Sequence, residues 1–67
     1  MRYMLCVSCV DGETDYGISG YDRASVLIFL ADHDHEGSSI YLRITNDDGV
    51  VEEHYDAEAI YKILGAI

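Results

Sequence analysis

Residues 21–37, YDRASVLIFLADHDHEG, combine a helix start signal, an apolar body and a helix stop signal. Asp22 can accept a backbone hydrogen bond as the N-cap residue, and an almost unbroken apolar run covers residues 24–31. Gly37 can adopt the left-handed conformation that closes many helices. Because this helix is apolar on most of its faces, we expect it to be buried, with the rest of the chain forming a sheet against it.

The chain has 67 residues, which suffices for one small domain and leaves no room for a second. Hydrophobic residues make up 49% of it, a share that argues against disorder. Domains of this size are often supplemented by oligomerisation, so both a monomer and a homodimer remain open. We therefore expect a single domain over residues 1–67.

The charge of the chain is strongly unbalanced. Thirteen acidic residues face four lysines and arginines, which gives a formal net charge of −9. Such a chain repels the phosphates of nucleic acids and membrane surfaces and is attracted to basic protein surfaces. The composition thus argues against direct nucleic-acid or membrane binding and favours a basic protein partner.

Two cysteines, Cys6 and Cys9, do not make a disulfide framework, and no apolar stretch reaches the roughly 18 residues that a membrane span needs. The N-terminus also lacks a cleavage pattern for a signal peptide. The spacing of the cysteines matches redox and zinc motifs, but here the pair falls in an expected strand, where Cys9 belongs to the core and Cys6 to the other face. We expect a complete cytoplasmic protein without redox chemistry.

The segment before the helix is typical of a β-hairpin. Residues 2–10 alternate in hydropathy, and Asp-Gly at positions 11–12 suits a two-residue type I′ turn. This turn predicts three facing pairs, Val10 with Glu13, Val7 with Tyr16, and Leu5 with Ile18.

A second hairpin follows the helix. Residues 39–45 alternate, with Ile40, Leu42 and Ile44 on one face, and the turn NDDG occupies positions 46–49. A two- or four-residue loop would align Val51 and Tyr55 with that face, and would place Arg43 opposite Glu52 or His54.

The chain then ends in an expected amphipathic helix. Asp56 is its candidate N-cap, and apolar residues recur at helical spacing at Ala57, Ile60, Ile63, Leu64 and Ile67. The two halves therefore share a strand-strand-helix plan, which we interpret as a short repeat whose two copies complete one core. The predicted fold is α+β, with a small antiparallel sheet of three to four strands, two helices on one face, and the order ββαββα.

The densest group of possible metal ligands is the segment Asp32, His33, Asp34, His35 and Glu36, with His54 elsewhere. Histidines and carboxylates are the ligands of Zn²⁺ and other divalent ions, but His33 and His35 point apart on a helix. The alternative is an ordinary solvated helix end. We expect no metal and no cofactor, and keep a small divalent-metal-binding protein as the runner-up.

Enzymatic motifs are also missing from the sequence. It has no nucleophile elbow, no glycine-rich phosphate loop and no metalloprotease helix, and a chain this short has little volume for both a core and a pocket. We therefore expect a protein that is not an enzyme.

The acids occur in clusters. Asp11, Glu13 and Asp15 share a spacing of two residues, as do Asp32, Asp34 and Glu36, so an extended backbone would align each triplet on one side. The second hairpin adds Asp47, Asp48, Glu52 and Glu53. A solubilising surface is the simpler interpretation, but such a surface usually mixes in lysines, which are nearly absent here.

Residues 39–64, SIYLRITNDDGVVEEHYDAEAIYKIL, resemble the acidic hairpin and following helix of some small phage-encoded anti-CRISPR proteins. The resemblance rests on the apolar strand with Arg43, the turn at positions 46–49 and the acidic return strand. It implies a mode of action, which is occupation of a nucleic-acid-binding surface on a CRISPR effector in the cytoplasm of a bacterial host.

The function we expect is therefore a non-enzymatic acidic inhibitor that mimics DNA and binds a basic surface of a protein partner. Its candidate partner-binding residues are Asp47, Asp48, Glu52, Glu53, Asp32, Asp34 and Glu36. Besides the metal-binding alternative, a plain dimerisation module remains possible.

Overall fold

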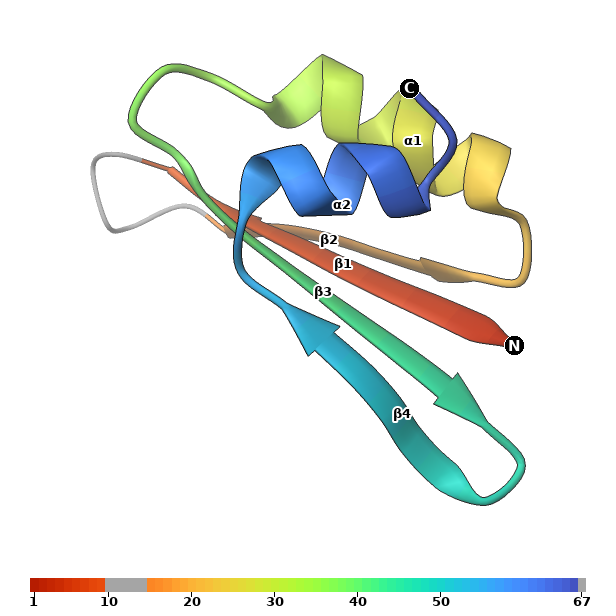
Figure 1. The fold of residues 1–67 in the computed structure, drawn as a ribbon. Helices are drawn as coiled ribbons and strands as arrows, with labels where there is room; N and C mark the ends of the chain where they lie inside the picture. Colours follow the sequence, from red (N-terminus) through yellow and green to blue (C-terminus); the bar gives the residue numbers. More distant parts are fainter. Residues whose placement is uncertain (10–14, 67) are drawn as a thin grey trace.

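The computed structural model describes residues 1–9 and 15–66 of the chain. Its elements, in order, are β1 (Arg2–Ser8), β2 (Asp15–Gly20), α1 (Arg23–His33), β3 (Ser39–Asn46), β4 (Gly49–His54) and α2 (Ala57–Ile63). This order is the predicted ββαββα, and the α+β class is confirmed (Figure 1).

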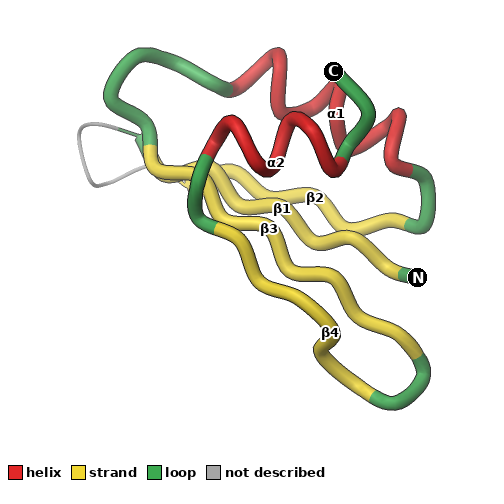
Figure 2. Tube along the Cα trace, in the orientation of Figure 1, coloured by secondary structure: helices red, strands yellow, loops and turns green. Residues whose placement is uncertain are grey.

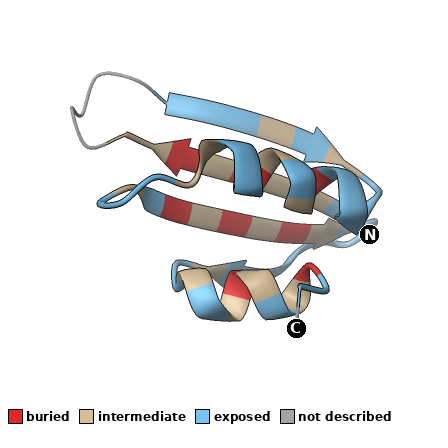
Figure 3. Ribbon diagram, turned by 90° about the horizontal axis from the view of Figure 1, so that it is seen from above, coloured by how far each residue is buried: buried red, intermediate tan, exposed pale blue. Residues whose placement is uncertain are grey.

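The four strands form one antiparallel sheet in the order β2-β1-β3-β4. Both helices lie on the same face of this sheet (Figures 1 and 2). Seen from above, α1 lies over the side of β1 and β2, and α2 lies on the side of β3 and β4 (Figure 3). The predicted two-layer arrangement is therefore present, and the other face of the sheet carries no helix.

The sheet joins two strand-strand-helix units through their first strands. β1 pairs with β3 so that Leu5 lies opposite Leu42 near the middle of both strands. The helices run in opposite directions, so the end of α1 lies beside the start of α2 (Figures 1 and 2). This arrangement approximates a twofold axis through the Leu5–Leu42 pair, as expected when two similar units complete one core.

The core lies between the sheet and the helices (Figure 3). Alternate residues of β1 and β3 meet one stripe of each helix, since successive strand residues point to opposite faces of a sheet. The buried residues are Leu5, Val7, Val26, Leu30, Ile40, Leu42, Ile44, Ile60 and Leu64. The predicted core-facing set Ile40, Leu42 and Ile44 is thus confirmed, and so are Leu5 and Val7 of the first strand, but not Cys9.

Helix α1 is not the buried helix that its sequence suggested. Val26 and Leu30 are its buried residues, whereas Ile28 is 64% exposed. The reason is geometric, because a two-layer domain covers a helix from one side only. The helix also ends at His33 with Asp34 as its C-cap, so Gly37 does not close it.

Gly37 instead serves the loop that follows. It has a φ of 86°, in the left-handed region that glycine adopts without strain. The backbone N–H of Ser38 donates to the carbonyl oxygen of His35 at 2.9 Å across this turn.

The two predicted N-caps differ in what they do. Asp22 accepts the backbone N–H of Ala24 at 3.0 Å and the hydroxyl of Ser25 at 3.1 Å. Asp56 occupies the same position before α2, but its side chain makes no capping hydrogen bond. Helix α2 is amphipathic as expected, with Ile60 and Leu64 buried. The predicted apolar position Ile67 lies outside the described residues.

The register of the first hairpin is confirmed by the pairs Leu5–Ile18 and Val7–Tyr16. The predicted pair of Val10 with Glu13, and the turn at positions 11–12, lie outside the described residues. Cys9 was predicted to be a core residue, but it follows the last residue of β1 and is only half-buried.

The second hairpin has a two-residue loop and a shifted register. An irregularity between Ile44 and Thr45 shifts the pairing, which places Arg43 opposite Glu53, and not opposite Glu52 or His54. Val51 and Tyr55 were predicted to lie on the core face, but they are 44% and 72% exposed.

Neither described helix is long and apolar enough to cross a membrane.

Candidate functional site

The turn between β3 and β4 is shaped by Asn46 and Gly49. The backbone N–H of Asp48 donates to Asn46 Oδ1 at 2.8 Å, and Asn46 pairs with Gly49 across the hairpin. Gly49 has a φ of 125°, which residues with a side chain rarely adopt. The loop therefore consists of Asp47 and Asp48, and both are exposed.

Hairpin β3–β4 extends beyond the two helices, so its tip has no helix above it (Figure 1). In β4, all residues from 49 to 53 are exposed, and Val50 and Val51 are 57% and 44% exposed. The tip thus presents two valines beside Asp47 and Asp48. An exposed apolar pair flanked by carboxylates is a surface that a protein partner can bind.

The two glutamates of β4 lie on opposite faces of the sheet. Glu52 pairs with Ile44, which faces the helices, whereas Glu53 pairs with Arg43 on the face without helices. The structure therefore separates two residues that the sequence placed in one acidic group.

Glu53 already has partners within the sheet. The hydroxyl of Tyr41 donates to Glu53 Oε1 at 2.5 Å, and Arg43 Nε donates to the Tyr41 hydroxyl at 2.8 Å. Arg43 Nε also lies 3.5 Å from Glu53 Oε1. The hydrogen bond to Glu53, followed by burial, raises the pKa of Tyr41. Glu53 is thus less available to a partner than the acids of the tip.

Glu52 has a weaker partner. Its Oε1 lies 3.5 Å from His54 Nε2, a distance that gives an ion pair when the imidazole is protonated. His54 Nε2 is buried and makes no hydrogen bond. With the imidazole neutral, the carboxylate of Glu52 has no cationic neighbour among the described residues.

The acids after α1 do not form the row that their spacing suggested. Asp32 still belongs to the helix, Asp34 is its C-cap, and Glu36 lies in the following turn, so the segment is not an extended strand. Asp34 Oδ2 accepts the hydroxyl of Tyr61 at 2.7 Å, which ties the end of α1 to α2. Burial, followed by this hydrogen bond, raises the pKa of Tyr61 to about 12.

The structure instead places most of the second-half acids along one border of the molecule. β4 is the outer strand of the sheet, and it runs from the tip directly into α2. We call the acids along this path the acidic edge, which comprises Asp47, Asp48, Glu52, Asp56 and Glu58. Near its helical end, α2 is linked to the end of α1 by the hydrogen bond from the hydroxyl of Tyr61 to Asp34, which is flanked by Asp32 and Glu36. The tip lies at the far end from these three acids.

Few of these charges are neutralised. Within residues 1–9 and 15–66, the ion pairs join Arg43 to Glu53 and, once protonated, His54 to Glu52. No ion pair there involves Asp47, Asp48, Asp56 or Glu58. The acidic edge is therefore an electrostatically unbalanced surface.

The segment considered for metal binding is not assembled as a site. His33 Nδ1 lies 2.9 Å from the carbonyl oxygen of Phe29, and its ring stacks on Phe29 with centroids 4.1 Å apart. The centroids of the His33 and Tyr16 rings lie 4.7 Å apart. His35 follows the end of α1 and is not part of the helix. Across the described parts of the chain, no three metal-ligating side chains gather.

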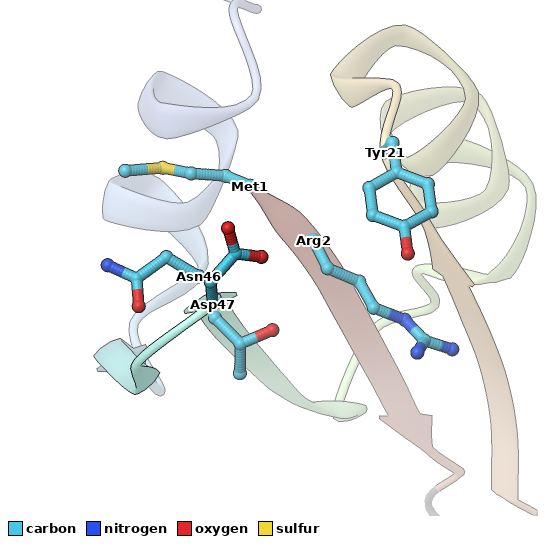
Figure 4. Close-up of a pocket in the computed structure, with 6 residues that line it drawn as sticks. Met1, Arg2, Tyr21, Asn46 and Asp47 are labelled. Atoms are coloured by element: carbon cyan, nitrogen blue, oxygen red, sulfur yellow. The ribbon is translucent and has the colours of Figure 1, made fainter.

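A hollow of about 300 Å³ lies at the end of the sheet near the N-terminus and is lined in part by Arg2, Tyr21 and Asp47. The guanidinium of Arg2 is directed toward the Tyr21 side of this hollow, away from Asp47 (Figure 4). Arg2 Nε donates to Ser19 Oγ at 2.6 Å, which is consistent with that direction. Arg2 therefore leaves the carboxylates of the tip without compensation.

Sequence reasoning did not identify the group of Tyr41, Arg43, Glu53 and Tyr55 on the face without helices. The rings of Tyr41 and Tyr55 lie 4.9 Å apart. Strand alternation had placed Tyr41 and Arg43 away from the core, so part of the signal was present. The shifted register of β4, which brings Glu53 and Tyr55 to them, could not be read from the sequence.

No protein-family model, curated protein or solved structure matches this chain.

Proposed function

We propose that this chain is a non-enzymatic acidic inhibitor that binds a basic, nucleic-acid-binding surface of a protein partner. The observation that supports it best is the tip of hairpin β3–β4, where Asp47 and Asp48 project beyond the helices without a cationic partner among the described residues. Carboxylates in such a place attract lysine and arginine, and the exposed Val50 and Val51 beside them offer apolar contact area.

The acidic edge carries fewer negative charges per unit length than one strand of DNA, so it can mimic such a strand only in part. From Asp47 to Asp56 the chain spans at most about 30 Å, at about 3.3 Å per extended residue. One strand of B-DNA carries a phosphate every 3.4 Å or so, hence roughly nine over that length. The four acids of the acidic edge within that span, Asp47, Asp48, Glu52 and Asp56, thus provide a little under half of that density, which is enough to compete only where additional contacts contribute.

The acids at the end of α1 are candidates for such additional contacts. Asp32 and Glu36 are exposed and flank Asp34, whose carboxylate contacts Tyr61 of α2, so a basic surface that follows the acidic edge onto α2 can extend to them. Asp34 contributes less, because its carboxylate already accepts a hydrogen bond from Tyr61.

The sharpest version of the proposal names a CRISPR effector as the partner, with the chain acting in the bacterial cytoplasm. This version rests on the resemblance of residues 39–64 to the acidic hairpin of some phage-encoded inhibitors. The effector's channel for nucleic acid is positively charged, and it is therefore the kind of surface that the acidic edge fits.

The test is inhibition of DNA binding by a panel of purified CRISPR effector complexes, measured by electrophoretic mobility shift. The chain is expected to displace DNA from at least one of them. Asp47→Lys with Asp48→Lys should weaken that inhibition by at least about tenfold, since like charges then face each other. Inhibition should also weaken as salt rises, because the Debye length falls from about 10 Å at 0.1 M to about 3 Å at 1 M.

The first hairpin provides a matched control. Asp11→Lys with Glu13→Lys changes the net charge equally, from −9 to −5, in the chain between β1 and β2. This control should retain most of the inhibition if position matters. Equal losses in both folded variants would show that undirected attraction suffices, and no inhibition of any effector would remove the CRISPR version.

A further inference from the structure

The face of the sheet opposite the helices is the one broad surface of the described structure that carries no second layer (Figures 1 and 2). We call it the open face. In its middle lie Met4, Cys6 and Tyr41, which are half-buried by their strand neighbours alone. Tyr55 stacks beside Tyr41 and is 72% exposed. The open face therefore combines apolar and aromatic groups that solvent reaches.

The open face also differs in charge from the rest of the chain. Among the described strand residues, the open face carries two of the four cations, Arg2 and Arg43, and two acids, Asp15 and Glu53. These charges cancel, so the net charge of −9 falls on the other residues. Two copies of the chain repel each other across most surfaces, and the open face is where they can approach at the lowest electrostatic cost.

We propose that the open face binds a second copy of this chain, forming a homodimer of two stacked sheets. The twofold axis of the dimer lies midway between the two sheets, which are about 10 Å apart. It runs perpendicular to the strands, at the level of the Leu5–Leu42 pair. Each copy then covers the open face of the other, while both helical layers remain outside.

This axis makes the open face self-complementary. Arg43 and Tyr41 are one residue to either side of Leu42, so the axis places Arg43 of one copy over Tyr41 of the other, a favourable cation–π arrangement. Met4 and Cys6 flank Leu5 in the same way and meet each other. In these contacts along β1 and β3, no two side chains of like charge face each other.

The ends of the strands match as well. Arg2 and Ser8 are three residues to either side of Leu5, and Ser8 pairs with Asp15. Arg2 of one copy therefore meets Ser8 of the second copy, with Asp15 of that copy beside it. Two symmetry-related Arg2–Asp15 contacts result.

The size of the open face sets the expected affinity. Four strands at about 4.8 Å and seven residues at about 3.3 Å give a projected area of roughly 450 Å². A standard interface buries about 800 Å² of accessible surface per partner, so this one lies at or below the lower end of the range. We expect a dimer that dissociates in the micromolar range or above.

The dimer has a consequence for the acidic edge, which rests on the proposed function. An axis across the strands keeps both β4 strands on the same side of the dimer. Two antiparallel acidic edges then lie next to each other, and together they hold about the charge of one DNA strand of equal length.

Charge reversal tests the interface by sedimentation equilibrium over a concentration series. Arg2→Glu places two acids together at each contact, and Asp15→Arg places two cations there, so each variant alone should dimerise at least about tenfold more weakly than the natural chain. A mixture of the two variants restores both contacts and has the same total charge as two natural chains. The mixture should therefore recover the natural dissociation constant to within a few fold.

Salt distinguishes this inference from the proposed function. Self-association of two acidic chains should strengthen as salt screens their repulsion, whereas binding to a basic partner should weaken. Circular dichroism of each variant checks that the fold is intact, and both positions are exposed. A natural chain that stays monomeric up to about 1 mM in 0.5 M salt overturns the proposal, since that excludes even a 1 mM dissociation constant. The proposal is also overturned if neither Arg2→Glu nor Asp15→Arg changes the dissociation constant of the dimer.

Discussion

The two strand-strand-helix units share one plan and differ in the use of their second strand. In the first unit, β2 lies on the side of the sheet that α1 covers, and Ile18 packs against the core. In the second unit, β4 extends beyond the helices and none of its residues belongs to the core. The first unit therefore completes the fold, whereas the outer strand of the second remains exposed.

The residues at the core-facing positions explain this difference. On β2, Ile18 lies opposite Leu5 and continues the apolar surface of β1. On β4, Glu52 and His54 occupy the corresponding positions opposite Ile44 and Leu42. Carboxylates at those positions are stable only at a solvated border, because burying an unpaired charge is costly. One plan can thus produce a strand that packs against the core or a strand that stays exposed, depending on two side chains.

The largest effect on stability should come from the central pair that the units share. Leu5→Ala and Leu42→Ala should each lower the free energy of unfolding by about 2 to 5 kcal/mol, because both side chains are fully buried. Val51→Ala in the outer strand should cost less than about 1 kcal/mol. Equilibrium urea denaturation measures all three. Markedly unequal losses at Leu5 and Leu42 would show that the units do not contribute equally to the core.

The caps provide a smaller comparison between the units. Asp22→Ala should lower stability by about 1 to 2 kcal/mol, because it removes a hydrogen bond to a helix N-terminus as well as a favourable charge. Asp56→Ala should cost less than about 1 kcal/mol, since only the charge contribution is lost. Thermal unfolding followed by circular dichroism compares them. Equal losses would mean that Asp56 makes the capping bond in solution.

The sequence predicted the order of elements, the described part of the first register and most core-facing residues of β1 and β3, because hydrophobic alternation and turn residues are local signals; Cys9 was the exception. Leu5, Val7, Leu42 and Ile44 followed from alternation alone. The sequence-based prediction overestimated the burial of α1, because an apolar run such as residues 24–31 does not indicate whether the helix is covered on one side or on several. Ile28 is the residue that shows this error.

The candidate site was less predictable than the fold. The irregularity beside Ile44 depends on how β4 pairs with β3, and it moved Glu53 to the open face and Val51 away from the core. The proximity of the α1 and α2 ends depends on how the helices pack. Sequence clusters of acids therefore indicated the chemistry of the surface, while the grouping of the acids required the structure.

Alkaline pH should weaken the contact between the units. The pKa of Tyr61 is raised from 10.0 to about 12 in the folded chain, so its protonated form is favoured there. The resulting stability is fully present below pH 10 and is lost as pH rises from 10 toward 12. Urea denaturation at several pH values should show this decline, and Tyr61→Phe should remove the part due to Tyr61. Tyr41 contributes in the same direction, because its pKa is also raised.

An identical pH decline in Tyr61→Phe would show that the hydrogen bond to Asp34 does not couple the end of α1 to α2. Asp34→Asn is the matched control, since an amide oxygen can still accept the phenolic hydroxyl while the charge is removed. That variant should keep the contact but lower the pKa of Tyr61 toward its ordinary value.

The smallest effect on stability should come from the tip of the second unit, and there the comparison with the first unit becomes a test of function. Val50→Thr with Val51→Thr keeps β-branched side chains on an exposed strand, so each change should alter stability by less than about 0.5 kcal/mol. If the tip contacts a partner, inhibition of DNA binding should nevertheless weaken several-fold, because apolar contact area is lost. Unchanged inhibition would mean that the partner meets the carboxylates of the tip and not its valines, and the acidic edge would then act by charge alone.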